Sequence, residues 1–116
     1  MPEQVGAGRM VAGGSEPVSG RFIALLDVDS LMSAMDGGDD RLIAYLEAPN
    51  VTMMAPIQAR LAGIACASGD ESAHVAIVSR ELELPCAVKV DLDVSLEELA
   101  GEQVTLWPDG RLTRGG

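Results

Sequence analysis

His74 is the only histidine of the chain. It lies in the segment SGDESAHVAIVSRELELP, which begins at Ser68 and is the part of the sequence richest in side chains that could take part in a reaction. A polar loop containing Gly69 precedes a stretch with helical spacing of apolar residues from about residue 73 to 82. This spacing places His74 in the first helical turn, where backbone N–H groups are unpaired and the helix dipole is positive. Such a helix start suits phosphate oxygens, and a neutral imidazole is a nucleophile that can hold a covalent intermediate. The segment therefore predicts chemistry at His74 that involves an anion.

Three other interpretations of the same groups remain. A lone histidine at a helix start is more often a surface or capping residue than a nucleophile. Asp70, Ser72 and His74 contain the groups of a hydrolase triad, but three groups within five residues are difficult to aim at one another. Cys66 and Cys86 could join Asp70 and His74 around zinc, yet the usual short spacings between ligands are missing. We expect no metal site and two buried, reduced cysteines.

The elements that must position His74 alternate along the chain. A helix over residues 73–82 is expected to bury Val75, Val78 and Leu82 on one stripe. The other expected helices are a short one after Asp29 or Ser30 that ends near residue 35, one over residues 51–62, and one over residues 96–99 capped by Ser95. Strands are predicted over residues 21–26, 42–46, 61–67, 86–90, 104–107 and 111–113. This alternation predicts a layered α/β fold.

The ends of the chain and its core are predicted from composition. Residues 1–12 read as an extended lead-in, with a short strand over residues 9–12, and residues 13–116 form one domain. Aromatic residues make up only 3% of the chain, so the core must be aliphatic. The pairs Met32 with Met35 and Met53 with Met54 are expected to fill that core.

Composition also restricts the partners. The chain has 116 residues with 18 acidic and 8 basic side chains, and a net charge of -10. This charge disfavours nucleic acid and membrane surfaces, and predicts basic docking surfaces on protein partners. The start has no signal-peptide core, and two cysteines are too few for a disulfide framework, so we expect a cytoplasmic protein.

The segment around His74 resembles the active-site motif of the swivelling phosphohistidine domain of phosphoenolpyruvate (PEP)-utilising enzymes. That family includes pyruvate phosphate dikinase, PEP synthase, enzyme I of the sugar phosphotransferase system and rifampicin phosphotransferase. Residues 74–77 match its His-Ala-Ala-Ile, residues 79–82 match Ala-Arg-Glu-Leu, and residues 84–85 match Ile-Pro. Ser68 and Gly69 stand for its Thr-Gly, and Ser72 takes its hydroxyl position two before the histidine. The resemblance extends from about residue 13 to residue 112.

Four positions depart from the family pattern. Asp70 replaces the second glycine of the loop, and Ala73 replaces a serine or cysteine. Glu83 replaces the glycine of Gly-Ile-Pro, and Lys89 stands where a glycine usually ends the following strand. Asp70 and Ala73 keep open an alternative function, a diverged swivel domain that binds and regulates a partner without transferring phosphate.

The resemblance implies a single-domain layered β/β/α phosphohistidine fold and a phosphoryl carrier. His74 would be the catalytic residue, with Ser68, Gly69, Asp70 and Ser72 around the phosphoryl group. Arg80 and Glu81 would have structural or docking roles, because Arg80 lies about 9 Å along the helix from His74. The domain itself would bind no cofactor. Mg²⁺ and ATP or PEP are expected on partners, namely an ATP-grasp-like nucleotide-binding protein and a protein that binds PEP, pyruvate or another acceptor.

Overall fold

The computed structural model describes residues 3–13, 16–25, 29, 32, 35, 41–47, 57, 59–68 and 74–114, with the backbone alone for His74 and Val75. The strands are β1 (Glu3–Ala12), β2 (Val18–Ala24), β3 (Leu42–Leu46), β4 (Leu61–Cys66), β5 (Cys86–Leu92), β6 (Gln103–Leu106) and β7 (Arg111–Arg114). The helices are α2 (His74–Leu82) and α3 (Leu96–Leu99).

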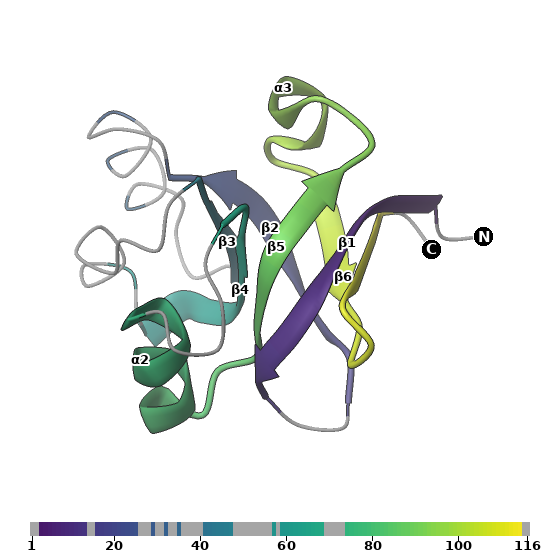
Figure 1. Cartoon of the computed structure of the whole chain (residues 1–116). Helices are drawn as coiled ribbons and strands as arrows, with labels where there is room; N and C mark the ends of the chain where they lie inside the picture. Colours follow the sequence, from purple (N-terminus) through teal and green to yellow (C-terminus); the bar gives the residue numbers. More distant parts are fainter. Residues whose placement is uncertain are drawn as a thin grey trace.

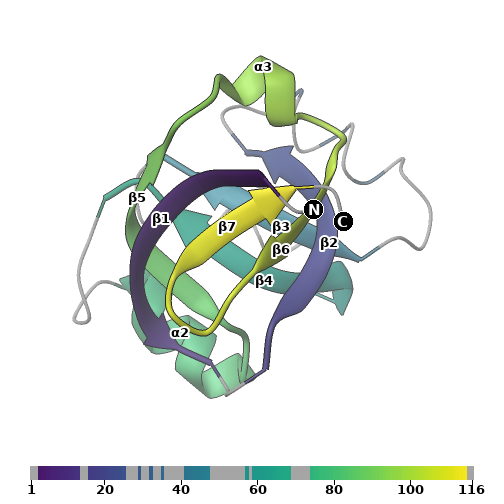
Figure 2. The ribbon, with the colours of Figure 1, turned by 90° about the vertical axis from the view of Figure 1, so that its right-hand side faces the viewer.

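The strands form a closed barrel in the order β1-β5-β4-β3-β2-β6-β7 (Figure 2). Strands β2, β3, β4 and β5 are parallel to their neighbours within that group. The pairs that involve β1, β6 or β7 are antiparallel. Parallel neighbours require long crossover connections, and α2 lies in the one between β4 and β5. The prediction of an α/β domain is therefore confirmed, although most of the described residues in regular elements are in strands.

The parallel strands separate two hydrophobic clusters. Along β3, Leu42, Ala44 and Leu46 belong to an outer cluster, whereas Ile43 and Tyr45 belong to the cluster inside the barrel. Successive side chains of a strand point to opposite faces, so a strand covered on both faces must be apolar throughout. This is why LIAYL is buried at all five positions, as the continuous apolar run predicted.

Helix α2 lies on the outside of the barrel and α3 at one end of it (Figure 1). Ser95 caps α3 as predicted, because its side chain accepts a hydrogen bond from the Glu98 N–H at 3.2 Å. Leu99 is fully buried within the inner cluster. The short helix thus covers the end of the barrel interior with an apolar side chain.

The first strand is the largest difference from the sequence prediction. Residues 3–12 form a ten-residue strand that pairs with β5 and β7, and the short strand expected over residues 9–12 was wrong in length. Gly8 suggested a loop but is needed for close strand contact. A Cβ there would lie 2.6 Å from Val90 Cγ2 and 2.8 Å from the Val88 carbonyl oxygen.

Two further predictions need correction. Met32 and Met35 are 58% and 53% exposed, so they do not fill the core; Met53 and Met54 lie outside the described residues. Leu61 and Ala62 were assigned both to the end of a helix over residues 51–62 and to the start of a strand over residues 61–67, and the structure places them in β4. The residues of that helix at 51–56 and 58 also lie outside the described residues.

Candidate functional site

His74 is the first residue of α2, which follows the carboxyl end of β4. The first turn of this helix contains no acidic residue, so no carboxylate within that turn occupies its positive end. The helix was predicted over residues 73–82, and the structure describes it as His74–Leu82, with residue 73 outside the described residues. Gly69, Asp70 and Ser72, which were predicted to surround the phosphoryl group, lie outside the described residues.

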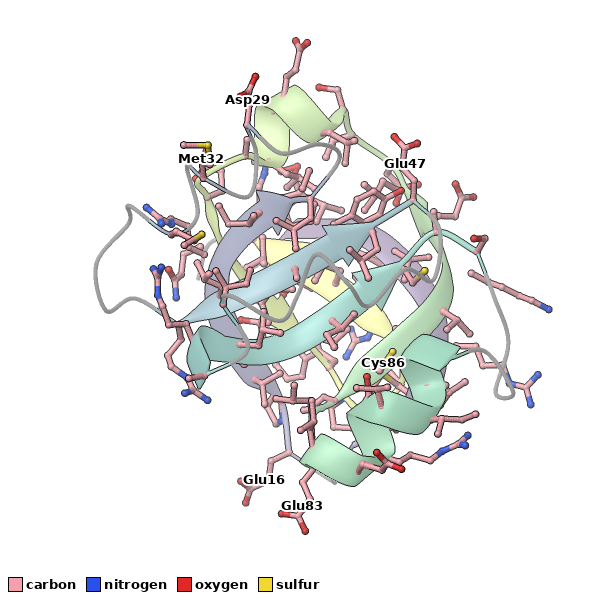
Figure 3. All side chains as sticks on the ribbon, turned by 90° about the vertical axis from the view of Figure 1, so that its left-hand side faces the viewer. Glu16, Asp29, Met32, Glu47, Glu83 and Cys86 are labelled. Carbon is pink, nitrogen blue, oxygen red and sulfur yellow. The ribbon has the colours of Figure 1, made fainter. Side chains whose placement is uncertain are left out.

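The start of the connection from β4 to α2 is fixed to β3. The Ala67 N–H donates to the Leu46 carbonyl at 2.8 Å, which continues the parallel ladder beyond the end of β4. The Ser68 hydroxyl donates to the Glu47 carbonyl at 3.0 Å. Figure 3 shows Glu47 at the end of β3, on the side of the sheet where the connection leaves. Because a hydroxyl has one proton, Ser68 in this geometry anchors the loop and has no proton left for a phosphate oxygen.

Helix α2 contacts the barrel through small side chains. Ala76 and Ser79 are fully buried, whereas Val78 and Leu82 are half-buried. Of the predicted stripe, Val78 and Leu82 are thus only partly buried, and the side chain of Val75 lies outside the described residues. The fully buried positions are small, which allows the helix backbone to approach the strands closely. The Ser79 hydroxyl is hydrogen-bonded to the Cys86 thiol, which gives this buried polar group a partner. Figure 3 shows Cys86 against this helix.

Arg80 connects the last turn of α2 to the first strand. Its Nε donates to the Val11 carbonyl at 2.9 Å. A cation in the last turn also interacts favourably with the negative end of the helix dipole. The side chain thus has a structural partner six residues after His74. Glu81, its neighbour, is exposed.

The end of α2 places Glu83 in the left-handed region. The Leu84 N–H donates to the Ser79 carbonyl at 2.9 Å and the Glu83 N–H donates to the Arg80 carbonyl at 3.3 Å. These two bonds define a Schellman motif, which needs a left-handed residue and prefers glycine there. Glu83 has φ 58°, and Figure 3 shows it at the end of the helix.

Lys89 is the other non-glycine residue with positive φ in the described part of the chain, at 54°. Glu83 and Lys89 are both positions at which the sequence departs from a family glycine. The structure therefore shows left-handed backbone at two of the four positions where the sequence departs from the family pattern. It placed Lys89 at the end of a strand, whereas β5 continues through it to Leu92.

The two cysteines are buried and free, as predicted. Burial raises the pKa of the Cys86 thiol to about 11, against smaller lowering contributions from the Ser79 hydrogen bond and the charge of Arg80. Burial also raises the pKa of Cys66. Both thiols are therefore protonated near neutral pH, which disfavours them as nucleophiles or metal ligands. Among the described residues, no three His, Cys, Asp or Glu side chains are grouped as a metal site.

Sequence reasoning missed the contributions of Glu47 and Val11 to the site. Both act through backbone carbonyl oxygens, which any residue type supplies, so the sequence carries no signal for them. Only the topology shows that the ends of β3 and β1 lie beside the β4–α2 connection and α2.

Comparison with known proteins identifies the family. The sequence profile of the mobile domain of PEP-utilising enzymes matches residues 40–110. These residues make up more than half of the chain and include His74. The chain belongs to this mobile-domain family. The matched region runs from just before β3 to the turn that precedes β7, so it contains β4, α2 and the connection between them.

Two proteins illustrate the likeness. PEP synthase from Pyrococcus furiosus is 34% identical over 70 residues, which are 60% of this chain and 8% of the synthase. The solved structure of the N-terminal domain of Enzyme 1 - Nitrogen superposes with a TM-score of 0.57 at 22% identity, over 70% of this chain and 34% of that one. The second match supports the fold. Both relatives extend far beyond the part that this chain matches.

The structure also bears on the membrane prediction. No helix among the described residues is long and apolar enough to span a bilayer.

Proposed function

We propose that the chain is a phosphoryl carrier and that His74 accepts the phosphoryl group. The observation that carries this proposal is the position of His74, at the first residue of α2 and inside the region that matches the mobile-domain family. It is also the only histidine in the sequence. A carrier needs one nucleophile whose phosphorylated form is stable enough to travel and reactive enough to discharge.

The proposed chemistry has two transfers. In the first, the lone pair of an imidazole nitrogen forms a bond to phosphorus while the bond from phosphorus to the donor oxygen breaks, and that oxygen keeps the electron pair. In the second, an oxygen of a small-molecule acceptor forms the new bond and the N–P bond breaks. Family resemblance implies the ε nitrogen. Such transfer depends mainly on positioning and on neutralising charge.

The surroundings of His74 divide into anchoring and binding groups. We assign Ser68 to anchoring, because its hydroxyl proton is used by the Glu47 carbonyl. Ser72 and the Gly69 backbone are the proposed ligands of the ring or the phosphoryl group. Asp70 would bring a carboxylate near that group, so the cations that balance the phosphate must come from the partners.

Because the donor and the acceptor would be bound at separate sites outside this domain, we expect two partner proteins. We propose that an ATP- or PEP-dependent partner phosphorylates His74 and that another subunit holds the acceptor, with Mg²⁺ in those sites. The proposed partners are an ATP-grasp-like nucleotide-binding protein and a protein that binds PEP, pyruvate or another acceptor. The domain would swivel between the two partners as one rigid body. In the proposed layering, the barrel supplies the two β layers and α2 belongs to the outer, helical layer. The closed hydrogen-bonding order and the two hydrophobic clusters support that layering.

The test uses an extract of the source cells, which contains the natural donors. Purified chain is incubated in the extract with radiolabelled ATP or PEP and recovered by affinity. We expect label that is acid-labile and alkali-stable, as expected for an N–P bond, and that is absent from His74→Ala. Endogenous phosphohistidine proteins in the extract control for donor activity. Acid-stable label, or no label while those proteins are labelled, would favour the non-transferring regulatory alternative.

A further inference from the structure

Three cations lie either on α2, the helix that carries His74, or on the two strands β1 and β5 that contact it, in a chain whose net charge is -10. They are Arg9 in β1, Lys89 in β5 and Arg80 in α2, and we call them the cationic strip. All three side chains are exposed. Two cations elsewhere in the described chain form ion pairs with carboxylates: Arg111 pairs with Asp109 at 2.8 Å, and Arg114 pairs with Glu3 at 2.9 Å and Glu98 at 3.6 Å.

Strand register and one hydrogen bond bring the strip together. Arg9 is the direct partner of Val88, so Lys89 is one residue along the neighbouring strand, and adjacent strands lie about 4.8 Å apart. The Arg80 Nε binds the carbonyl of Val11, which is two residues, or about 7 Å, from Arg9 along β1. In the described part of the chain, neither Arg80 nor Lys89 forms an ion pair with a carboxylate.

Lys89 occupies a backbone position that suits glycine better. The register moves from Ala7 opposite Asp91 to Arg9 opposite Val88, so two steps along β1 correspond to three along β5. Lys89 lies in this β-bulge with φ 54°, and bulges re-aim side chains. Family members usually have glycine there. Lys89 is thus a long, exposed cation kept at a strained position, with no ion pair to a carboxylate among the described residues, and a role for its charge explains why it is kept.

We infer that the cationic strip docks an acidic surface of the protein that exchanges the phosphoryl group with His74. This inference rests on the proposed function for the identity of the partner. Arg80 and His74 lie on the same nine-residue helix, so a partner seated on the strip lies along α2 toward the histidine. Complementary charge orients docking and speeds encounter. The strip differs in charge from the chain as a whole, whose net charge of -10 predicted basic partner surfaces.

An acidic peptide tests the strip without any phosphoryl donor. A hexaglutamate peptide is titrated at low ionic strength into the ¹⁵N-labelled chain, and amide shifts are followed by NMR. We expect saturable, salt-sensitive shifts at Arg9, Arg80, Lys89 and their neighbours, although chain and peptide are both acidic. Lys89→Gly should weaken binding about two- to five-fold, the range expected for one exposed ion pair. Lys89→Arg should bind as the native chain does. No saturable shift, or shifts centred on Arg111 and Arg114, would overturn the inference.

The second measurement uses the donor protein found by the labelling experiment. Arg9→Glu combined with Lys89→Glu should raise the KM for the donor protein at least ten-fold and leave kcat nearly unchanged, with loss of the salt dependence. Arg111→Glu is the matched control, because that cation already pairs with Asp109. Unchanged KM in the double variant contradicts the docking role while the carrier function stands. Absence of any labelling contradicts the carrier function, and the peptide titration still decides whether the strip binds acidic surfaces.

Discussion

Replacing Glu83 by glycine is expected to stabilise the protein, because it removes the β-carbon from a left-handed backbone. Glu83 is the residue after α2 in a Schellman motif, with φ 58°. The left-handed conformation costs a residue with a β-carbon about 1–2 kcal/mol. Removing this cost stabilises the protein, but glycine also makes the unfolded chain more flexible, which offsets about 0.4–1 kcal/mol of the stabilisation. The net expectation is about 0.5–1 kcal/mol.

The assay is urea and thermal unfolding followed by circular dichroism. For a chain of this size the gain corresponds to a rise in Tm of about 2–5 °C. Glu83→Ala is the matched control, because it removes the same carboxylate but keeps the β-carbon. Relief of the unfavourable charge at the helix end contributes only a few tenths of a kcal/mol, about 0.3. If alanine stabilised the protein as much as glycine, the stabilisation would come from charge and the conformational argument would be wrong.

Lys89→Gly is expected to give a stability gain of the same size for the same reason, since its φ is 54°; if it lowers Tm, the strain assigned to the bulge is absent. Gly110→Ala should lower the free energy of unfolding by about 2 kcal/mol or more, because φ is 94° and the added Cβ would overlap the Gly8 carbonyl oxygen. Gly101→Ala should lower it by only about 1 kcal/mol, because φ is 81° but the space around the added Cβ is open. Equal losses in urea unfolding would refute the clash. Because the pKa of Cys86 rises from 9.0 to about 11 on folding, its contribution is complete below pH 9 and is lost as pH rises to 11, by at most about 3 kcal/mol. A free energy of unfolding with the same slope over that pH range in Cys86→Ala would contradict this. Arg80→Ala should cost about 1 kcal/mol by removing the hydrogen bond to the Val11 carbonyl, and an unchanged urea midpoint would show that the bond contributes nothing.

The local elements could be predicted where short-range pattern decides the structure. LIAYL is buried at every position, so its apolar run marks β3 at the residues observed. Ser95 has the side chain and spacing of an N-cap, and it caps α3. The resemblance found the His74 segment, and two of the departures from family glycines that it pointed out, Glu83 and Lys89, have left-handed backbone in the structure.

Other features depend on packing between distant segments. Gly6 and Gly8 read as loop residues, but they allow β1 to approach β5 closely. Ala76 and Ser79 form the buried face of α2 because the helix lies close to the barrel, which hydrophobic spacing alone does not report. The anchors of the site are backbone carbonyls supplied by Glu47 and Val11, and only the order of strands places them there.

The central claim is that His74 carries the phosphoryl group, and NMR of the imidazole tests it most directly. The chain is prepared with ¹⁵N-labelled histidine, so His74 gives the only imidazole signals. It is then phosphorylated in the extract of the source cells. The account predicts one phosphorus nucleus coupled to the ε nitrogen, and loss of that coupling on acid treatment. An unmodified imidazole in a chain that carries phosphate on Ser72 or another hydroxyl would contradict it.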